Sequence, residues 1–257
     1  GFPTGPETAV SGGSFQNFED NGAIYCSRQG TFTVHGSIYM KYSALGGPAG
    51  GWWGFPTGPE TVGMGGSFQN FEDNGAIYCS RHGTFTVHGG ICWTYNYLGG
   101  PTRGWWGFPT GPETAVSGGS FQNFEDNGAI YCSRHGTFTV HGGIYRKYEE
   151  LGGPTGGWCG FPTGPETAVV GGSFQNFEDN GAIYCSRHGT FTVHGGIYMK
   201  YEELGGPTGG WWGFPTGPET AAPGGSFQNF EDNGGSFIRV CWDGVQYSSC
   251  GGVDVVP

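Results

Sequence analysis

The residues with the most obvious chemistry form a carboxylate pair that recurs five times. The pairs are Glu19-Asp20, Glu72-Asp73, Glu125-Asp126, Glu178-Asp179 and Glu231-Asp232. Glycosidases need two carboxyl groups facing one bond about 5 to 9 Å apart, whereas adjacent residues at a strand end point to opposite faces. We therefore expect no catalytic dyad. The pair either stabilises its own turn or binds sugar hydroxyls through the Asp and the Asn that follows it.

Tryptophan doublets are the second chemically distinctive feature. They stand at Trp52-Trp53, Trp105-Trp106 and Trp211-Trp212, and one is reduced to Trp158-Cys159. We expect one ring of each doublet to fill core space and the other to be partly exposed. An exposed indole offers a flat apolar platform for a pyranose ring and an N–H group for one hydroxyl.

Histidines also recur at fixed positions. His35, His88, His141 and His194 stand between an apparent strand and an apparent helix. The simpler interpretation is a buried imidazole that bonds a carbonyl or caps the helix; the alternative is ligand contact. A second histidine recurs as His82, His135 and His188, and Gln29 takes its place in the first copy. Glutamine can preserve a polar contact, but its presence weakens the case for a metal site. No Ser-His-Asp or Cys-His arrangement recurs.

Together with one tyrosine per copy, these residues make up the predicted carbohydrate-binding set. No catalytic residue, metal ligand or cofactor is expected. A Ca²⁺ site in particular is disfavoured because two adjacent carboxylates supply too few oxygen ligands. The set is Asp20, Asn21, Tyr25, His35, Trp53; Asp73, Asn74, Tyr78, His88, Trp106; Asp126, Asn127, Tyr131, His141, Trp158; and Asp179, Asn180, Tyr184, His194, Trp212.

These residues recur because the chain consists of tandem copies of one 53-residue unit. A unit of this size cannot bury its own apolar face, so neighbouring copies are expected to stack. We predict a single repeat domain over residues 1–257. It divides into residues 1–53, 54–106, 107–159, 160–212 and a truncated capping repeat, 213–257.

Each copy predicts three strands and a short helix. Residues 14–18 and 23–26 flank an Asn-Gly pair, a strong hairpin signal, and residues 31–34 alternate with a period of two. Ile38, Tyr42 and Leu45 share one helix face.

Glycine and proline set the boundaries of these elements. The helix is expected to end at Gly46-Gly47-Pro48. The opening of each copy, rich in Pro and Gly, is expected to be an irregular connector followed by an exposed loop tip. The fifth copy lacks the helix and keeps a hairpin, which is either a terminal cap or the closure of a ring.

Composition and charge exclude several classes of protein. The 56 glycines lack a G-X-Y period, which excludes collagen, and 16% aromatic residues exclude a disordered glycine-rich tract. A net charge of −11 with ten dispersed Lys and Arg argues against binding nucleic acid or an anionic membrane surface. No apolar run approaches the roughly 18 residues of a spanning helix. Since the sequence begins at Gly1 and shows no signal peptide, we expect a processed form.

The eight cysteines are of two kinds. Cys26, Cys79, Cys132 and Cys185 share one repeat position and are expected to be buried free thiols. Cys241 and Cys250 flank a turn closely enough to form a disulfide, which favours an oxidising setting. A second bridge between Cys92 and Cys159 is left open. None shows the C-x-x-C spacing of a structural zinc site.

Four segments of the unit occur in the order and spacing of a known family. They are Trp53-Gly54-Phe55-Pro56-Thr57 with Glu60-Thr61, Gly75-Ala76-Ile77-Tyr78, Val87-His88-Gly89-Gly90-Ile91 and Leu98-Gly99-Gly100. The unit is similar to the LGFP repeat of cell-envelope proteins in mycolate-containing bacteria. The resemblance implies a closed, β-propeller-like ring and binding of cell-wall polysaccharide such as arabinogalactan.

Two positions depart from the family pattern. The leading Leu is Trp53, Trp106, Trp212 or Cys159, and the aromatic residue after Ile-Tyr is a cysteine. We therefore carry over the architecture and glycan binding, but not the particular polymer.

The sequence thus predicts a mainly β protein with short helices, a closed ring of five tandem repeats, and no enzymatic activity. We expect a lectin-like protein, secreted or cell-wall associated, that binds cell-surface or cell-wall glycans through equivalent sites in or between repeats. The alternative is a structural envelope or matrix protein that uses its repeats for protein–protein contact. Glycans are the expected partners. We expect neither binding to nucleic acid nor insertion into a membrane, and formation of a homo-oligomer is left open. A polysaccharide hydrolase acting through Glu72 and Asp73 is disfavoured.

Overall fold

The computed structural model describes residues 1–209, 212–231, 237–242 and 247–249. The chain divides into two compact units. The first comprises Gly1–Ala115 and Ser120–Cys132, and the second Val116–Gly119 and Ser133–Pro257, so the boundary lies within the third repeat. None of the described helices is long and apolar enough to cross a membrane.

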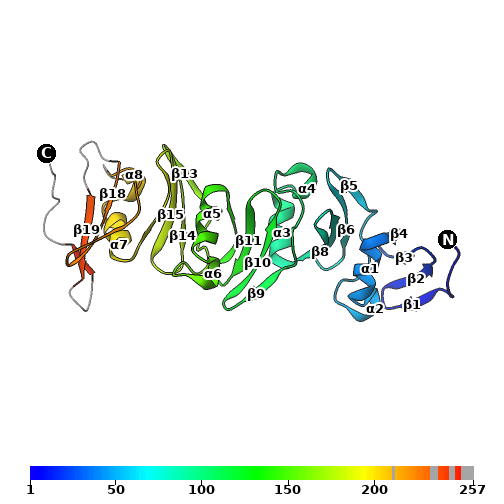
Figure 1. Cartoon of the computed structure of the whole chain (residues 1–257). Helices are drawn as coiled ribbons and strands as arrows, with labels where there is room; N and C mark the ends of the chain where they lie inside the picture. Colours follow the sequence, from blue (N-terminus) through cyan, green and yellow to red (C-terminus); the bar gives the residue numbers. More distant parts are fainter. Residues whose placement is uncertain (210–211, 232–236, 243–246, 250–257) are drawn as a thin grey trace. The chain divides into compact units, whose positions relative to one another are not determined.

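The first repeat is an antiparallel sheet followed by two helices (Figure 1). Its strands are β1 (Thr8–Val10), β2 (Gly13–Phe18), β3 (Gly22–Ser27) and β4 (Gly30–His35), and its helices are α1 (Gly36–Ala44) and α2 (Gly47–Gly50). The strands pair in the order β1-β2-β3-β4. The predicted three-stranded meander and short helix are therefore confirmed.

The later repeats contain the same elements, and the fifth contains strands alone among its described residues. The second has β5 (Thr61–Gly63), β6 (Gly66–Phe71), β7 (Gly75–Ser80), β8 (Gly83–His88), α3 (Gly89–Tyr97) and α4 (Gly100–Arg103). The third has β9 (Thr114–Val116), β10 (Gly119–Phe124), β11 (Gly128–Ser133), β12 (Gly136–His141), α5 (Gly142–Glu150) and α6 (Gly153–Gly156). The fourth has β13 (Thr167–Val169), β14 (Gly172–Phe177), β15 (Gly181–Ser186), β16 (Gly189–His194), α7 (Gly195–Glu203) and α8 (Gly206–Gly209). The fifth has β17 (Thr220–Ala222), β18 (Gly225–Asn229), β19 (Phe237–Trp242) and β20 (Tyr247–Ser249).

The short first strand of each sheet differs from the sequence prediction, which treated this region as connector and loop tip. β1 pairs with β2, with Thr8 opposite Phe15, and Pro3 forms an isolated bridge with Phe18. Proline is tolerated here because an edge position does not require its missing N–H group. The tip remains exposed as predicted, since Val170 at the equivalent point of the fourth repeat is 99% exposed.

The Asn-Gly hairpin between the second and third strands is confirmed. Its asparagines adopt left-handed backbone angles, with φ of 53° at Asn21, 53° at Asn74, 52° at Asn127 and 50° at Asn180. Asparagine tolerates this region better than most residues. The carbonyl of Asn21 also accepts a hydrogen bond from the Gly36 amide at 2.8 Å, which ties the turn to the start of α1.

The helix lies between two sheets, its own and that of the next repeat (Figure 1). α1 packs on β3 and β4 and also on β7 and β8, and α7 packs in the same way on β16 and β19. Ile38 and Tyr42 are buried as predicted, and Leu45 is half-buried. The chain leaves the helix at Gly46, whose φ of 93° requires glycine.

The apolar core is therefore built between repeats. One cluster joins Tyr25, Ile38 and Tyr42 of the first repeat to Trp53, Phe55, Phe71 and Ile77 around the second. Equivalent clusters form around Phe108 and Phe124 in the first unit and around Phe214 and Phe230 in the second. The expectation that neighbours stack because one unit cannot bury its own apolar face is confirmed.

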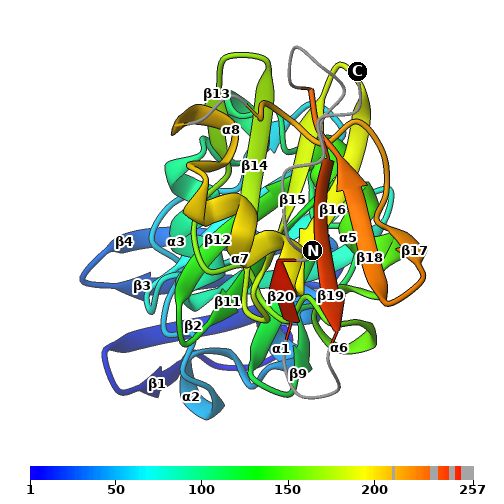
Figure 2. The same cartoon turned by 90° about the vertical axis from the view of Figure 1, so that its left-hand side faces the viewer.

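Ring closure goes beyond what these elements establish. Each described sheet consists of four strands adjacent in sequence, and no sheet among the described residues contains strands from two repeats. In the fifth repeat, β18 lies beside β19, and β19 pairs with β20 as the predicted hairpin (Figure 2). The mainly β fold with short helices is established, whereas the closed, β-propeller-like ring stays a prediction.

Replacing a phenylalanine of the inter-repeat core tests where the stability resides. Phe108 is fully buried against the second repeat, whereas Phe2, at the same position of the first repeat, is 78% exposed. We expect Phe108→Ala to lower the free energy of unfolding by about 3–5 kcal/mol. The matched control Phe2→Ala should change it by less than about 0.5 kcal/mol. Denaturant unfolding followed by tryptophan fluorescence measures both, and equal losses would contradict a core built between repeats.

Candidate functional site

Consecutive repeats are joined by a completely buried glutamine. Nε2 of Gln69 donates to the carbonyl of Thr33 in the preceding repeat at 3.0 Å and to the carbonyl of Gly58 at 2.9 Å. Gln122, Gln175 and Gln228 make the equivalent pairs of bonds. A buried amide that bonds two backbone carbonyls fixes the register of the two repeats, because any shift would leave it unpaired.

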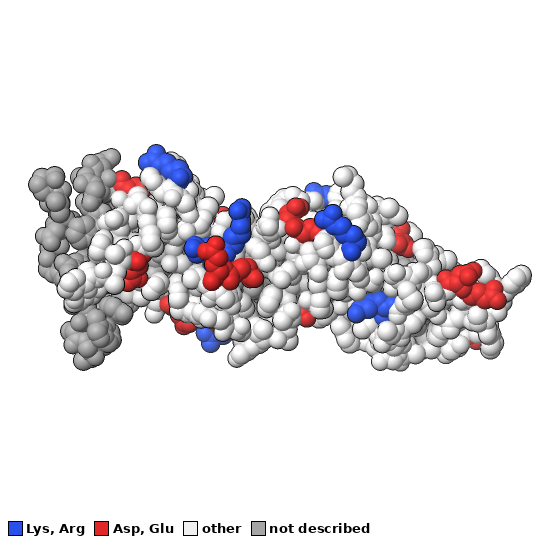
Figure 3. Space-filling model, viewed as in Figure 1, with Lys and Arg blue, Asp and Glu red and all other residues white. Residues whose placement is uncertain are grey.

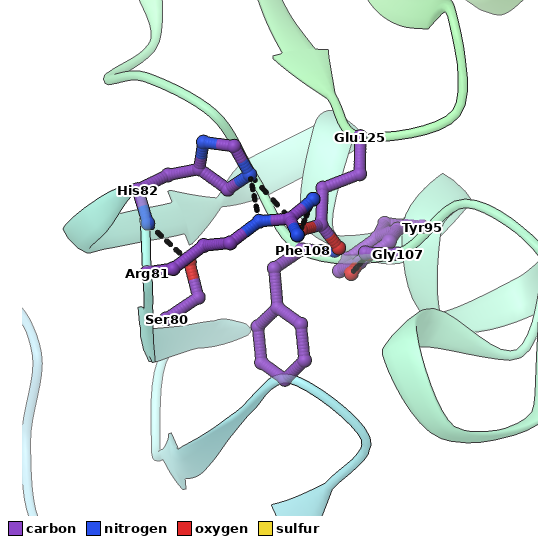
Figure 4. Close-up of polar contacts among 7 residues, drawn as sticks. All are labelled: Ser80, Arg81, His82, Tyr95, Gly107, Phe108 and Glu125. Carbon is purple, nitrogen blue, oxygen red and sulfur yellow. Dashed lines mark hydrogen bonds and ion pairs between the residues drawn. The ribbon is translucent and has the colours of Figure 1, made fainter.

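A glutamate reinforces each junction (Figure 4). Oε2 of Glu125 accepts a hydrogen bond from the Phe108 amide at 2.8 Å, while Oε1 lies 3.0 Å from Nε2 of His82 and 3.2 Å from Nη2 of Arg81. The hydroxyl of Tyr95 donates to the carbonyl of Gly107 beside them. Glu72, Glu178 and Glu231 occupy the same position at the other junctions.

This arrangement assigns the two members of the Glu-Asp pair different roles. In the second to fifth repeats the Glu is committed to the preceding repeat's Arg-His or Arg-Gln turn. Asp73 and Asp179 are exposed on the turn beside it. The pair therefore contributes one structural carboxylate and one solvated carboxylate, and Arg28 pairs with Glu72 of the next repeat.

A second contact between repeats brings His88 next to a glutamate and a tryptophan from its two neighbours. Nε2 of His88 lies 3.1 Å from Oε2 of Glu113 in the third repeat. Its ring also meets Trp52 of the first repeat edge-on, with centroids 5.0 Å apart. Trp158, His194 and Glu219 form the equivalent cluster in the second unit, with a ring distance of 4.6 Å and an Nε2–Oε2 distance of 3.2 Å. We call these Trp-His-Glu groups the indole clusters.

The first two tryptophan doublets each supply a buried ring and an exposed ring, as the sequence suggested. Trp53 is 3% exposed and Trp52, stacked on it at 4.6 Å, is 52% exposed. Trp106 and Trp105 repeat this arrangement at 1% and 53% exposure and 4.7 Å. One face of each outer ring stacks on its neighbour, and the outer residue stays about half exposed to solvent.

The outer ring is the first of the doublet, whereas the predicted set named the second. Trp53 and Trp106 are buried because the next residues are pinned into the junction, where the Tyr42 hydroxyl donates to the carbonyl of Gly54. Trp212 is buried as well. Trp52 and Trp105 are the exposed rings of these doublets and are absent from the predicted set, although the doublet itself was the signal that one ring would be exposed.

The third connector differs because Cys159 replaces the inner tryptophan. Trp158 then takes over the inner position: a Cβ on Gly181 would lie 2.2 Å from its ring, and the equivalent contact at Gly75 is made by Trp53. Trp158 is accordingly half-buried. This junction offers a smaller aromatic surface than the first two.

The other predicted site residues fall into three environments. Tyr25, Tyr78, Tyr131 and Tyr184 are buried in the core, and burial raises the pKa of Tyr25, Tyr78 and Tyr184, so they offer no surface to a glycan. The turn residues are exposed, namely Asn21, Asn74, Asn127 and Asn180 with the adjoining Asp20, Asp73, Asp126 and Asp179. His35, His88, His141 and His194 face Glu60, Glu113, Glu166 and Glu219. No described helix is capped by its histidine side chain, which removes one of the two simple interpretations.

Cys92 and Cys159 form no disulfide, so the second bridge left open is not formed. Burial raises the pKa of Cys92 to about 11 and that of Cys159 to about 12, which keeps both protonated at neutral pH. The repeated cysteines form no disulfide, as predicted, but they are not buried: Cys26 is exposed and its counterparts are half-buried. Cys250 lies outside the described residues, so the Cys241–Cys250 bridge stays a prediction.

Charged side chains form separated groups of acidic and basic residues on one face of the molecule, which is otherwise mostly uncharged (Figure 3). Among the described residues, no group of three or more His, Cys, Asp or Glu side chains is arranged to hold a metal ion. The indole clusters can offer a ligand aromatic stacking and hydrogen bonding.

The junction glutamate makes stability depend on pH. The Phe161 amide, with His135 and Arg134, lowers the pKa of Glu178 below its ordinary value of 4.5. Because the folded state favours the ionised form, this contribution is complete above about pH 4.5 and is lost as the pH falls through the lowered pKa. We expect Glu178→Gln to cost about 1 kcal/mol at pH 7, the difference between a charged and a neutral hydrogen bond, and to flatten the loss of stability below pH 4.5.

Urea unfolding between pH 3 and pH 7 measures this effect. The matched control is Asp179→Asn, which removes the same charge from the exposed neighbour and should leave the pH profile unchanged. The same flattening in both variants would contradict a specific role for the junction glutamate.

Comparison with known proteins agrees with the repeat geometry. The sequence model of the LGFP repeat matches residues 1–50, 54–102, 107–156 and 160–209, which leaves the fifth repeat unmatched. A search of curated proteins gave no match. Among solved structures, the crystal structure of BamB from Moraxella catarrhalis aligns with 92% of this chain at 8% identity. This chain spans 60% of that structure, and the TM-score of 0.15 is too low to support an argument about fold. Since the four matched segments cover well over half of the sequence, this chain belongs to the LGFP repeat family.

Proposed function

We propose that the protein binds carbohydrate through the exposed tryptophans at its repeat junctions. The observation that carries the proposal is the pairing of a half-exposed indole with a fixed imidazole and carboxylate in one indole cluster, Trp52, His88 and Glu113. A pyranose ring has an apolar face of C–H groups and a rim of hydroxyls. The exposed indole suits the former, and the imidazole and carboxylate suit the latter.

The position of Trp52 favours a preorganised platform. One face of its ring stacks on Trp53, which is held in the core, and the ring lies at 80° to that of His88. A ring supported on two sides loses little conformational freedom when a ligand binds, which lowers the entropic cost of binding. Trp105 has the same support from Trp106.

The sites are shallow and recurrent, so affinity depends on their number. Each exposed indole covers at most one sugar ring, and such a contact is weak by itself. A surface polysaccharide presents many equivalent rings, so several weak contacts on one chain gain strength through effective concentration. This is the lectin-like, multivalent binding expected from the sequence, without catalysis.

The preferred ligand is a neutral glycan. The net charge of −11 opposes polyanions, and the arginine at each of the four junctions is paired with a glutamate. LGFP repeats are typical of cell-surface proteins, which favours a cell-wall or cell-surface polysaccharide as the partner and a secreted or wall-associated location.

The test is removal of the two platforms. We expect the double variant Trp52→Ala and Trp105→Ala to bind an immobilised neutral cell-wall polysaccharide at least about tenfold more weakly, a loss of about 1.4 kcal/mol. The matched control is Trp93→Ala, which removes a 69% exposed tryptophan of α3 that belongs to neither a Trp-Trp connector nor an indole cluster. Surface plasmon resonance measures both. Unchanged binding of the double variant, or an equal loss in Trp93→Ala, would contradict the proposed site.

Competition separates this function from the alternative of a structural protein that binds other proteins. A free oligosaccharide of the same polymer should displace the chain from isolated cell walls in proportion to its concentration. A protein–protein association would persist at saturating sugar, and that result would favour the structural alternative.

A further inference from the structure

The helix of the second repeat differs in sequence from its counterparts. The second and fourth repeats are identical except at nine positions, and five of these lie in α3. The residues of the second repeat at these positions are Val62, Gly63, Met64, Cys92, Trp93, Thr94, Asn96, Tyr97 and Arg103. The sequence changes are therefore concentrated in one short helix.

The altered residues of α3 line a cavity of about 230 Å³. Its lining consists of Asn74, in the turn between β6 and β7, and of Cys92, Trp93, Asn96 and Tyr97. Four of the five residues that distinguish α3 thus face a single cavity. An engineered apolar cavity of about 150 Å³ holds benzene. This cavity therefore has room for one aromatic ring.

The other repeats show which group the cavity suits. The position of Cys92 is occupied by Tyr39 in the first repeat and by Tyr198 in the fourth. The hydroxyl of Tyr39 donates to Oδ1 of Asn17 at 3.1 Å. Tyr198 donates in the same way to Oδ1 of Asn176 at 3.5 Å. A phenol ring thus spans the space between the helix and the second strand of these sheets, and a cysteine side chain is too short to do so.

The hydrogen-bond acceptor of these tyrosines is retained in the second repeat. It is Asn70, which is exposed, whereas Asn17 and Asn176 are half-buried. The thiol sulfur of Cys92 lies in the core and accepts a hydrogen bond from Nδ2 of Asn96 at 3.4 Å. The second repeat therefore presents the acceptor for a phenol hydroxyl without the residue that supplies this hydroxyl in the first and fourth repeats.

Two exposed aromatic side chains form a wall of the cavity. Trp93 and Tyr97 are 69% and 80% exposed, and their rings stack with centroids 5.8 Å apart and an angle of 8° between their planes. The fourth repeat has Met199 and Glu203 at these positions. None of the lining residues is charged, so the cavity favours a neutral ring that packs against the aromatic pair.

We propose that the cavity beside α3 binds a phenol ring. The ring takes the place that Tyr39 and Tyr198 have in their own repeats, and its hydroxyl donates to Asn70. A free phenol and a tyrosine side chain of another polypeptide both present this group, so the shared chemistry is that of a para-alkylphenol. The site includes neither a Trp-Trp connector nor an indole cluster, so this binding is independent of polysaccharide binding.

The test is a titration of the full chain with p-cresol, which has the structure of a tyrosine side chain. Two-dimensional NMR of the isotope-labelled protein follows the side-chain amides of Asn74 and Asn96 and the indole N–H of Trp93. We expect saturable shifts at these groups, with one ligand bound per chain. Toluene, which lacks the hydroxyl, should bind about fivefold more weakly because one hydrogen bond is lost.

Filling the cavity provides the decisive variant. Cys92→Tyr restores the residue of the first and fourth repeats, and it should weaken p-cresol binding at least about tenfold by occupying the same space. The matched control Cys92→Ala removes the same thiol and keeps the cavity, so p-cresol binding should be retained. If Cys92→Tyr does not unfold cooperatively, Tyr97→Glu decides instead. It introduces the glutamate of the fourth repeat at an 80% exposed residue and should weaken binding at least about tenfold by removing part of the aromatic wall.

A second ligand distinguishes the two sources of the phenol. If N-acetyltyrosinamide binds as tightly as p-cresol, the ring is assigned to a tyrosine side chain, and if it is excluded, the ring is assigned to a free phenol. Binding of p-cresol supports the proposal in both cases.

Three results would overturn the proposal. The first is the absence of any saturable shift with p-cresol in the folded chain. The second is equal binding of p-cresol by Cys92→Tyr and Cys92→Ala. The third is binding of methyl glucoside at the same groups in preference to p-cresol, which would make the cavity a sugar site.

Discussion

The structure depends on an apolar helix face that its own repeat covers only in part. Ile38 and Tyr42 project from α1, and their shared cluster with Phe55 and Phe71 belongs partly to the next repeat. Each repeat is therefore completed by its successor, which is the nearest-neighbour logic of repeat proteins. The buried glutamine and the junction glutamate add direction to this packing, because Gln69 and Glu72 both contact the preceding repeat. A repeat so built has two unlike faces, one toward the preceding repeat and one toward the following repeat.

This asymmetry also determines where chemistry is available. Most aromatic residues of each repeat are buried in the core, as is Tyr25 of β3. The connector is the exception, because it has two consecutive tryptophans and core space for one. The surplus indole lies on the surface beside His88, whose own partner, Glu113, comes from the following repeat. The indole cluster therefore forms only when three successive repeats are in place.

Much of the fold was accessible from the sequence because local rules dominate within a repeat. The Asn-Gly turn, the alternation over residues 31–34 and the spacing of Ile38 and Tyr42 each act over a few residues. Each corresponds to an observed element: the β2–β3 hairpin, β4 and α1. The first strand was missed because prolines and glycines surround it. Its partner, β2, was also already assigned to the Asn-Gly hairpin. The predicted closure of the ring would depend on contacts between distant repeats, for which the local pattern carries no information.

The sequence by itself determined the period, the strand and helix content of the unit, and the residue types able to contact a sugar. Tertiary structure alone decided which of those residues are free. Trp52 and Trp53 are chemically identical, and they differ only because the junction pins Gly54 and draws the second ring into the core. One carboxylate oxygen of Glu125 is likewise paired only because His82, 43 residues away in the preceding repeat, lies against it, while the other oxygen accepts from the Phe108 amide of its own repeat. Burial and pairing are set by neighbours in space, and a linear pattern does not specify them.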